Sequence, residues 1–436
     1  MIINLLCVSI IYALSTVFTT VGDIPDVEAM NESSVTVMFW NLENFFDFRD
    51  DGKSESDAEF SATGERRWTK TRFYRKCQAI AKTILWAGSN KSGDVPDIVG
   101  VAEVENRFAL GQLVSKTALR KLDYEIVHFD SPDPRGIDCA LLYRASRLTL
   151  VSAKPCHVSA PGLQTRDILM AQFVTLTGDS LAVLVNHHPS KYGGGETDWR
   201  REVAVARLRA LGDSLAAAGW TRAVAVGDFN DTPENPLFDR LATTFFLCRF
   251  SVPEAPLQNR QGKPSSEGNA VEDEPSLRGK GSIRFNGEWQ LIDLCFVSPA
   301  LEGAASFSVL EPPFLTERDA AHSGDRPLRT YSGPRYLGGV SDHRPILVHI
   351  RSSHHPFSYT PNTPTLPYSS SHTNSHYARP DLRLLHHSPM CALSTTSLTS
   401  SLPHCPSTLS SMRLLSLRSN TACAKESSKN RDFLYK

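Results

Sequence analysis

The sequence has almost no net charge, because 46 Lys and Arg stand against 47 Asp and Glu in a chain of 436 residues. The formal net charge of -1 excludes a general electrostatic attraction to nucleic acid or to an anionic membrane. A polyanionic substrate would therefore have to meet positive charge at a local site. A bound metal ion is the obvious source of such charge.

Closely paired cysteines are also missing. The chain holds nine cysteines at scattered positions, and an odd number without close pairing does not indicate a disulfide framework. No CxxC pair and no Cys/His spacing of the zinc-binding kind occurs. Cys139 and Cys295 lie within apolar runs, so we expect both to be small buried core residues.

The N-terminus has no Lys or Arg in its first ten residues and is apolar over about 18 residues. We expect residues 1–22 to be a signal peptide, which predicts an exported protein, either secreted or periplasmic. The alternative is an uncleaved signal anchor. Only in that case would a membrane be a partner.

The C-terminal residues 352–436 lack any sustained periodicity. They hold 19 Ser and nine Thr, seven of the 14 His, and scattered Pro. This composition is typical of a disordered tail. Adjacent histidine pairs in the tail could bind metal loosely, but solvated low complexity is the favoured interpretation.

Between these ends there is neither an internal repeat nor a linker, so we expect one domain over residues 30–351. Helices are predicted at 70–87, 107–121 and 198–218. Surface loops are predicted at 47–69 and 252–282. Apolar and β-branched runs predict the following strands: 35–46, 96–106, 124–129, 138–144, 148–153, 169–177, 181–189, 221–231, 289–298 and 345–350. Local strand pairing with helices between some strands suggests two sheets packed face to face with helices outside.

Polar residues stand where these apolar strands begin or end. Any one of them alone is more often a turn former or a helix cap. Asp293 differs, because a charge inside the apolar run LIDLCFV needs a partner, and His343 is our candidate. The set at strand ends is Asn41, Glu43, Glu103, Glu105, Asn186, His187, Asp228, Asn230, Asp231, Asp293, Asp342 and His343.

If the strand ends converge, they form a cup of carboxylate and amide oxygens with two histidines. Hard oxygen ligands suit Mg²⁺, Mn²⁺ or Ca²⁺ rather than zinc. Such an ion polarises a phosphoryl oxygen, while an imidazole donates or accepts a proton. The sequence therefore indicates a metal-dependent hydrolase of phosphate esters.

The ordered motifs resemble the endonuclease/exonuclease/phosphatase superfamily, the fold of deoxyribonuclease I. They are FWNLENFFD, DIVGVAEVEN, RGIDCALLYR, TRDIL, VNHHPS, VGDFNDTPENP, GEWQLIDLCFVS and GGVSDHRP, spread from about residue 35 to 350. The long NLENFFD and AEVEN forms resemble a bacterial branch of this superfamily. The resemblance implies an α/β four-layer sandwich of two mainly antiparallel sheets flanked by helices.

The resemblance also implies residue roles. It implies metal binding by Asn41, Glu103 and Asp342, with Mg²⁺ or Mn²⁺ as the expected ion and Ca²⁺ as a further candidate. It implies catalytic roles for His187, Asp228, Asn230, Asp293 and His343. Whether Asp228 or His343 removes the proton from water stays open.

Four further residues are candidates for substrate contact, with a structural salt bridge as an equal alternative for most of them: Arg135, Asp138, Arg166 and Lys191. Glu105 faces either the site or solvent. We expect a single-step attack by water, because no Ser or Cys nucleophile stands out among the motifs.

The favoured function is a phosphodiesterase or endonuclease acting on DNA or RNA. A phosphatase or lipid phosphodiesterase, of the inositol-phosphate or sphingomyelin type, is the alternative. A catalytically silent binding protein on the same fold is the alternative of another class. No protein partner is implied.

Overall fold

The computed structural model describes residues 34–89, 95–191, 194–248 and 281–352. Contacts divide the chain into two units, residues 1–356 and 357–436, and all described residues lie in the first. The predicted signal peptide (1–22), almost all of the predicted tail and nearly all of the predicted 252–282 loop lie outside the described residues. No helix among the described residues is long and apolar enough to cross a membrane.

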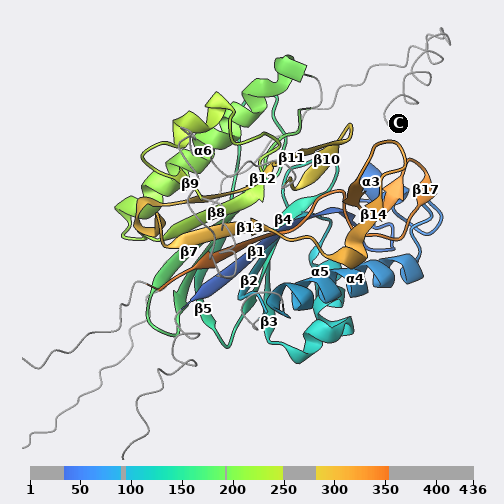
Figure 1. The fold of residues 1–436 in the computed structure, drawn as a ribbon, viewed down its shortest axis with the longest axis horizontal. Coiled ribbons are helices and arrows are strands. Elements are labelled where there is room, and N and C mark those ends of the chain that lie inside the picture. The colour runs from blue at the N-terminus through green and yellow to red at the C-terminus, as the bar shows by residue number, and fades with distance from the viewer. Residues whose placement is uncertain (1–33, 90–94, 192–193, 249–280, 353–436) are drawn as a thin grey trace, which may run out of the picture. The chain divides into compact units, whose positions relative to one another are not determined.

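Two six-stranded sheets form the centre of the fold (Figure 1). The first sheet has the order β13 (Ala305–Val309), β18 (Ile346–Ile350), β1 (Val35–Phe45), β2 (Ile98–Val104), β4 (Asp138–Arg144) and β3 (Tyr124–His128). The second has the order β5 (Leu148–Cys156), β6 (Ile168–Thr175), β7 (Ser180–His187), β8 (Ala223–Asp228), β12 (Asp293–Val297) and β9 (Phe246–Leu247).

Neighbouring strands are antiparallel except β1 with β2 and β7 with β8. The prediction of two mainly antiparallel sheets is therefore confirmed. Three two-stranded hairpins complete the strands: β10 (Ile283–Phe285) with β11 (Glu288–Gln290), β14 (Thr316–Arg318) with β15 (Asp325–Pro327), and β16 (Tyr331–Ser332) with β17 (Arg335–Tyr336).

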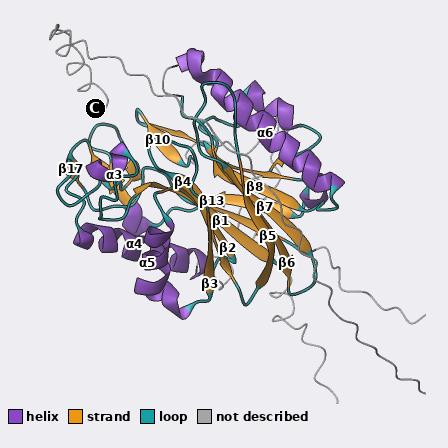
Figure 2. Ribbon diagram, turned by 180° about the vertical axis from the view of Figure 1, so that it is seen from behind, coloured by secondary structure: helices purple, strands orange, loops and turns teal. Residues whose placement is uncertain are grey.

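Helices lie outside both sheets, as a four-layer sandwich requires (Figure 2). Helix α6 (Asp198–Ala217) covers the second sheet, and α4 (Lys70–Ser89) and α5 (Arg107–Lys116) cover the first. A short helix α3 (Glu55–Glu59) precedes them. Short 3-10 turns lie at η1 (Ala118–Lys121), η2 (Gly194–Thr197), η3 (Pro236–Leu241), η4 (Pro299–Leu301) and η5 (Pro313–Leu315).

Alternation along β1 shows how one strand serves two cores. Val37 and Phe39 point between the sheets, where they join residues of the second sheet. Met38, Trp40 and Leu42 point outward and pack under α4 and α5. Side chains of a strand alternate between its two faces, so β1 is apolar throughout because both faces are covered.

Helix α4 confirms the 3.6-residue pattern that the sequence predicted. Its buried face comprises Phe73, Cys77, Ile80, Ala81 and Ile84. The predicted 107–121 helix is interrupted at Thr117, whose hydroxyl donates to Leu113 O and accepts from Leu119 N–H. The chain therefore continues as the 3-10 turn η1 rather than as α-helix.

Two further sequence predictions need correction. The single strand expected at 289–298 is two strands, because β11 pairs with β10 whereas β12 pairs with β8. Ser282 Oγ accepts the N–H groups of Ile292 and Asp293 where the chain changes partner. The 47–69 segment is not merely a surface loop, since Phe60 and Trp68 are buried in it.

Five strands between the last two predicted strands were missed, β13 to β17. Four of them are only two or three residues long. So short a strand carries no readable alternation, and its pairing partner comes from a turn rather than from a hydrophobic pattern.

Gly227 lies where β7 and β8 approach most closely. A Cβ at this position would stand 2.4 Å from Asn186 O and 2.6 Å from Asn186 Cβ. The variant Gly227→Ala should therefore lower the free energy of unfolding by roughly 1–3 kcal/mol through overpacking. Urea denaturation measures this, and Gly178→Ala, in the β6–β7 turn where a Cβ meets nothing within 4 Å, tests backbone strain alone. Equal stability of Gly227→Ala and wild type would contradict the steric argument.

Candidate active site

Strand ends from both sheets meet at one edge of the sandwich. Asn41 on β1 belongs to the first sheet and Asp228 on β8 to the second, yet Asn41 Nδ2 donates to Asp228 Oδ2 over 3.0 Å. His187 and Asp293 lie opposite Asp228 in the strand register. Hydrogen bonds and close charge contacts connect all eight residues that the sequence selected: Asn41, Glu103, His187, Asp228, Asn230, Asp293, Asp342 and His343.

Asp228 stands at the centre of this group. Its Oδ1 accepts the backbone N–H of Asn230 at 2.9 Å. Its Oδ2, besides the Asn41 contact, lies 3.7 Å from His187 Nε2 and 3.7 Å from His343 Nε2. Two imidazoles therefore flank one carboxylate oxygen from either side.

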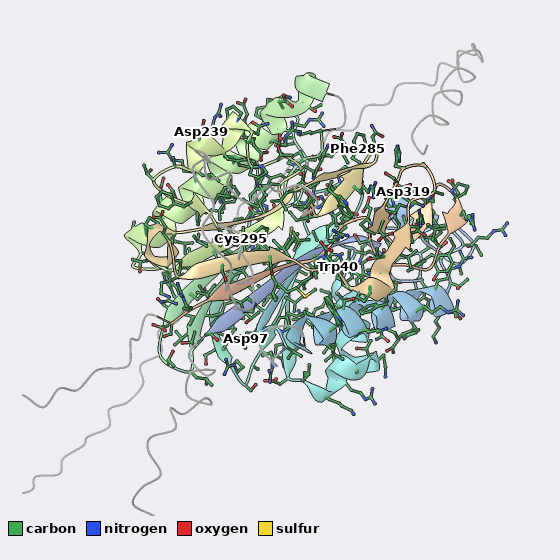
Figure 3. All side chains as sticks on the ribbon, viewed as in Figure 1. Trp40, Asp97, Asp239, Phe285, Cys295 and Asp319 are labelled. Atoms are coloured by element: carbon green, nitrogen blue, oxygen red, sulfur yellow. The ribbon has the colours of Figure 1, made fainter. Side chains whose placement is uncertain are left out.

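His343 is held rigidly. Its Nδ1 lies 2.7 Å from Asp293 Oδ2, which confirms the predicted partnership. Its backbone N–H donates to Ser341 Oγ, and its carbonyl accepts from Trp40 Nε1 at 2.9 Å (Figure 3 labels Trp40). Ser341 Oγ in turn donates to Asn41 O. The ring that faces Asp228 is thus fixed in position and rotation.

Glu103 adopts a left-handed backbone conformation, φ 61°, at the end of β2. This conformation is strained for a residue with a Cβ and is often found at functional sites. One carboxylate oxygen, Oε2, accepts Asn44 N–H at 2.9 Å. The other, Oε1, lies 3.4 Å from Asn41 Nδ2 and 3.7 Å from His187 Nε2. Oε1 therefore faces the site.

The orientation of Asn41 differs from that of a metal ligand. Its Oδ1 accepts Glu43 N–H at 2.9 Å, which turns Nδ2 toward Asp228 and Glu103. An amide binds a metal through its oxygen. In this arrangement Asn41 acts as a donor that positions two carboxylates.

Arg329 is a site residue that the sequence analysis missed. It lies 3.0 Å from Asp342 Oδ2 and 2.7 Å from Glu43 Oε1, so it bridges the two carboxylates. Lys76 donates to Glu43 O and to the hydroxyl of Thr330, the residue after Arg329. In the sequence, Arg329 is simply an arginine 13 residues before Asp342 in a segment without periodicity, so no pattern selects it.

Burial determines the charge at the centre. It raises the pKa of Asp228 to about 7, with neighbouring Asp293 acting in the same direction and His343 against it. Burial disfavours the imidazolium of His343, but Asp293 and Asp228 outweigh it and raise its pKa well above the usual value. At neutral pH, His343 therefore carries the proton, and Asp228 is poised to gain or lose one.

His187 differs from His343 in its charge. Burial, together with the positive charges of Arg166 and Arg135, lowers the pKa of His187 well below its usual value. Its Nδ1 is buried without a hydrogen-bond partner among the described residues. His187 is thus a neutral imidazole whose Nε2 faces Asp228 and Glu103.

The donor set fits a divalent cation. Asp293 is wholly buried, and its Oδ1 has no hydrogen-bond partner among the described residues. Asp228, Asp293 and His343 also bring ligand atoms within 4.8 Å of one another, but Asp293 binds the protonated ring of His343, so Glu103 and Asp342 are the carboxylates better placed to hold the ion. Buried negative charge of this density needs a compensating cation, and carboxylate oxygens favour Mg²⁺, Mn²⁺ or Ca²⁺.

Two of the four substrate candidates are committed to internal contacts. Arg166 is buried, with Nη1 at 2.9 Å from Asp133 Oδ2 and Nη2 donating to His188 O. Asp138 is buried between His128 Nε2 and Ser131 N–H. Arg166 therefore forms a structural salt bridge, the alternative that the sequence left open. Asp138 holds the loop that follows β3.

The other two candidates are accessible. Arg135 is half exposed beside Asp133, with 3.4 Å between Nε and Oδ1. Lys191 is also half exposed, and its Nζ lies 2.6 Å from Asp231 Oδ1. Asp231 follows Asn230 and pairs with buried Arg201 at 3.2 Å. Substrate contact stays a prediction for Arg135 and Lys191.

The sequence left open whether Glu105 faces the site or solvent, and in the structure it faces neither. Its Oε2 accepts Asp47 N–H at 2.6 Å beside the α3 segment. Burial raises the pKa of Glu105 to about 9, and the charges of Asp47 and Asp57 act in the same direction. The carboxyl is therefore protonated in the folded protein at neutral pH.

This raised pKa predicts a stability that depends on pH. In the unfolded chain the Glu105 pKa falls to its usual 4.5. The folded state then binds the extra proton, so its contribution to stability is complete below about 4.5 and is lost as the pH rises toward 9. Glu105→Gln, which keeps the oxygen acceptor, should flatten the melting temperature between pH 5 and 9, about the range of this titration. Identical pH slopes for wild type and variant would contradict this.

Comparisons with known proteins agree with the geometry. A model of the Endonuclease/Exonuclease/phosphatase family matches residues 36–352. A search of the curated proteins finds no match. Among solved structures, the human Nocturnin catalytic domain with bound sulfate anion is 17% identical, with a TM-score of 0.42, over 72% of this chain and 93% of that domain.

Two further solved structures are similar to this chain. A mannosyl-6-phosphatase from Bacteroides thetaiotaomicron is 18% identical, with a TM-score of 0.43, over 72% of this chain and 98% of that one. Truncated TDP2 from Caenorhabditis elegans is 16% identical, with a TM-score of 0.42, over 73% and 98%. Because the family model covers most of the chain, this protein belongs to the endonuclease/exonuclease/phosphatase family, whose enzymes are metal-dependent hydrolases of phosphate esters.

Proposed function

We propose that this enzyme is a divalent-metal-dependent phosphodiesterase that cleaves nucleic acid by direct attack of water. The observation that carries the proposal is the carboxylate of Asp228 placed 3.7 Å from both His187 and His343, with Asp293 holding the second ring. No serine or cysteine stands among the described residues that contact this carboxylate. A covalent enzyme intermediate is therefore not needed.

Asp228 is the group best suited to accept the proton of the attacking water. A general base works best when its pKa is near the working pH, and burial brings Asp228 to about 7. His343 is protonated in this arrangement, so it cannot accept a second proton. We therefore assign the base to Asp228, a choice that the sequence left open.

His343 and His187 would then act on the phosphate. The protonated ring of His343 faces the site with Nε2 and supplies positive charge to the transition state. Neutral His187 donates a hydrogen bond from Nε2, because a neutral imidazole still carries one N–H. Asn230 Nδ2 donates to His188 O, which keeps its loop close to Asp228.

Glu103 and Asp342 would hold the metal ion. Glu103 presents Oε1 toward the site, and Asp342 retains Oδ1 while Arg329 binds Oδ2. The positive charges of Arg329, His343 and Lys76 hold the pKa of Asp342 below its usual value against the effect of burial, so its oxygens stay charged. A bound divalent ion would supply Lewis-acid stabilisation of the charge on the phosphate.

Metal removal tests the proposal directly. The full-length protein should hydrolyse bis(p-nitrophenyl) phosphate and plasmid DNA with Mg²⁺ or Mn²⁺, and EDTA should reduce both activities at least about 100-fold. Excess Mg²⁺ should restore them. A protein that cleaves p-nitrophenyl phosphate but no diester would instead be a phosphatase, and turnover that survives EDTA would overturn the metal site.

A further inference from the structure

Six large apolar side chains are exposed among the described residues: Phe129, Val151, Leu176, Trp199, Leu247 and Phe285. Single exposed apolar residues are ordinary on protein surfaces. Their distribution is not ordinary here. The three aromatic residues all belong to the edge of the sandwich that carries the site, and the three aliphatic residues do not. We call Phe129, Trp199 and Phe285 the aromatic rim.

Phe285 stands on the β10–β11 hairpin next to His343. Ile283, two residues earlier, forms a β-bridge with His343. The hairpin is pinned from its other face, where Arg344 lies 3.6 Å over the Trp289 ring. Arg284 is the residue opposite Trp289, so strand alternation places Phe285 on the other face of the hairpin, where it is 59% exposed (Figure 3 labels Phe285).

Trp199 and Phe129 approach the same edge from the two sheets. Trp199 is the second residue of α6, two positions before Arg201, which pairs with Asp231 beside the catalytic loop. Phe129 follows the last residue of β3, His128, which binds Asp138. Asp138 opens β4 opposite Val104, the residue after Glu103.

Exposed cations lie close in the chain to two of these rings. Arg200 is exposed next to Trp199, with its guanidinium carbon 5.8 Å from that ring. Arg135, in the loop after Phe129, and Lys191, in the loop before Trp199, are half exposed although each has an acidic partner. Asp130, 83% exposed, adds negative charge beside Phe129.

Separate exposed rings with cations nearby in the chain match one kind of ligand. Unpaired nucleobases stack on aromatic side chains while the backbone phosphates meet nearby cations. A lipid surface would instead favour a continuous apolar patch that includes aliphatic residues. The aliphatic residues lie elsewhere, with Leu176 in the β6–β7 turn at the opposite strand ends and Val151 and Leu247 on edge strands.

We propose that the aromatic rim binds single-stranded nucleic acid, stacking unpaired bases around the site where the strand is cut. This inference rests on the proposed phosphodiesterase function. Bases within a duplex already stack on each other and present only their edges, so their faces would not be available to the rim. The enzyme should therefore cut a single strand in preference to a duplex.

The test compares a substrate that offers bases with a small phosphodiester that offers none. Wild type, Phe285→Ala, Trp199→Ala and the double variant are assayed on a fluorescent single-stranded oligonucleotide, on the same oligonucleotide annealed to its complement, and on bis(p-nitrophenyl) phosphate. Loss of one stacking ring should raise the oligonucleotide KM about tenfold. The ratio of the two kcat/KM values should fall by a similar factor, and further in the double variant. Phe129→Ala should show the smallest effect because Asp130 opposes phosphate there.

Controls separate stacking from damage to the fold. Phe285→Trp keeps a stacking ring and should restore the oligonucleotide KM to within about threefold of wild type. Leu176→Ala, an equally exposed residue at the opposite strand ends, should change neither activity. Melting temperatures establish that each variant is folded.

The outcomes are distinct. If wild type hydrolyses neither substrate, the proposed function fails. If the small diester is cut and the rim variants leave the oligonucleotide KM unchanged, the rim inference fails alone. Equal losses on single strand and duplex would also overturn it. The rim inference also fails if the rim variants lose binding to sphingomyelin vesicles but keep binding to the oligonucleotide.

Discussion

The variant His343→Ala should lose about 10²- to 10⁴-fold in kcat/KM on a phosphodiester while remaining folded. His343 is the only ring in the site whose proton is held by a buried carboxylate among the described residues, through the 2.7 Å contact from Nδ1 to Asp293 Oδ2. Alanine removes both the charge that faces the phosphate and the donor that faces Asp228. Steady-state kinetics with Mg²⁺ measures the loss.

A second histidine, on the strand that follows His343, serves as the control. His349 lies at the far end of β18, opposite Thr36 rather than opposite the site. His349→Ala should keep activity within about threefold of wild type, because it touches no reacting group. Asp293→Asn should give an intermediate loss, since the ring stays but its charge is no longer supported. Full activity of His343→Ala would remove the site assignment.

The variant Asp228→Asn should lose about 10³-fold or more in turnover, because an amide cannot accept the proton of the attacking water. Its volume is unchanged, and the bond from Asn230 N–H to an oxygen at Oδ1 survives the exchange. The loss should appear in kcat rather than in KM, because the base acts in the transition state.

Stability gives this variant an independent readout. Burial raises the pKa of Asp228 to about 7 from its usual 3.8. In the metal-free protein, ionisation of Asp228 therefore costs stability progressively as the pH rises from about 3.8 through 7. Without metal at pH 8, Asp228→Asn should melt no lower than wild type, which excludes misfolding as the cause of the lost activity.

Asp239→Asn makes the matched control for this exchange. Asp239 is an exposed aspartate on η3, well separated from the site in Figure 3. It should leave both kcat and the melting temperature unchanged. A similar loss of activity in both aspartate variants would show that net charge, rather than the position of Asp228, sets the rate.

Most of the fold was readable from periodicity. All three predicted helices and ten stretches of strand correspond to elements of the structure, because long apolar patterns report which face is buried. The short strands β14 to β17 could not be predicted from the sequence. Two or three residues carry no pattern, and their pairing follows from turns that the surrounding body supports.

The candidate site was readable for a different reason. A charge such as Asp293 inside an apolar run is costly without a partner, so its presence alone required a second group. His343 is that group, at 2.7 Å. The motif order then selected the remaining strand ends, and the contacts connect all eight residues across both sheets.

The sequence by itself determined which residues stand at strand ends and which chemistry their side chains allow. Only the tertiary structure determined the orientation, the contacts and the charge of each of these side chains. It turned the amide nitrogen of Asn41 toward Asp228, brought Arg329 to Asp342, and made His187 neutral beside a protonated His343. These properties depend on burial and on charges that lie far away in the chain, and neither has a local signal in the sequence.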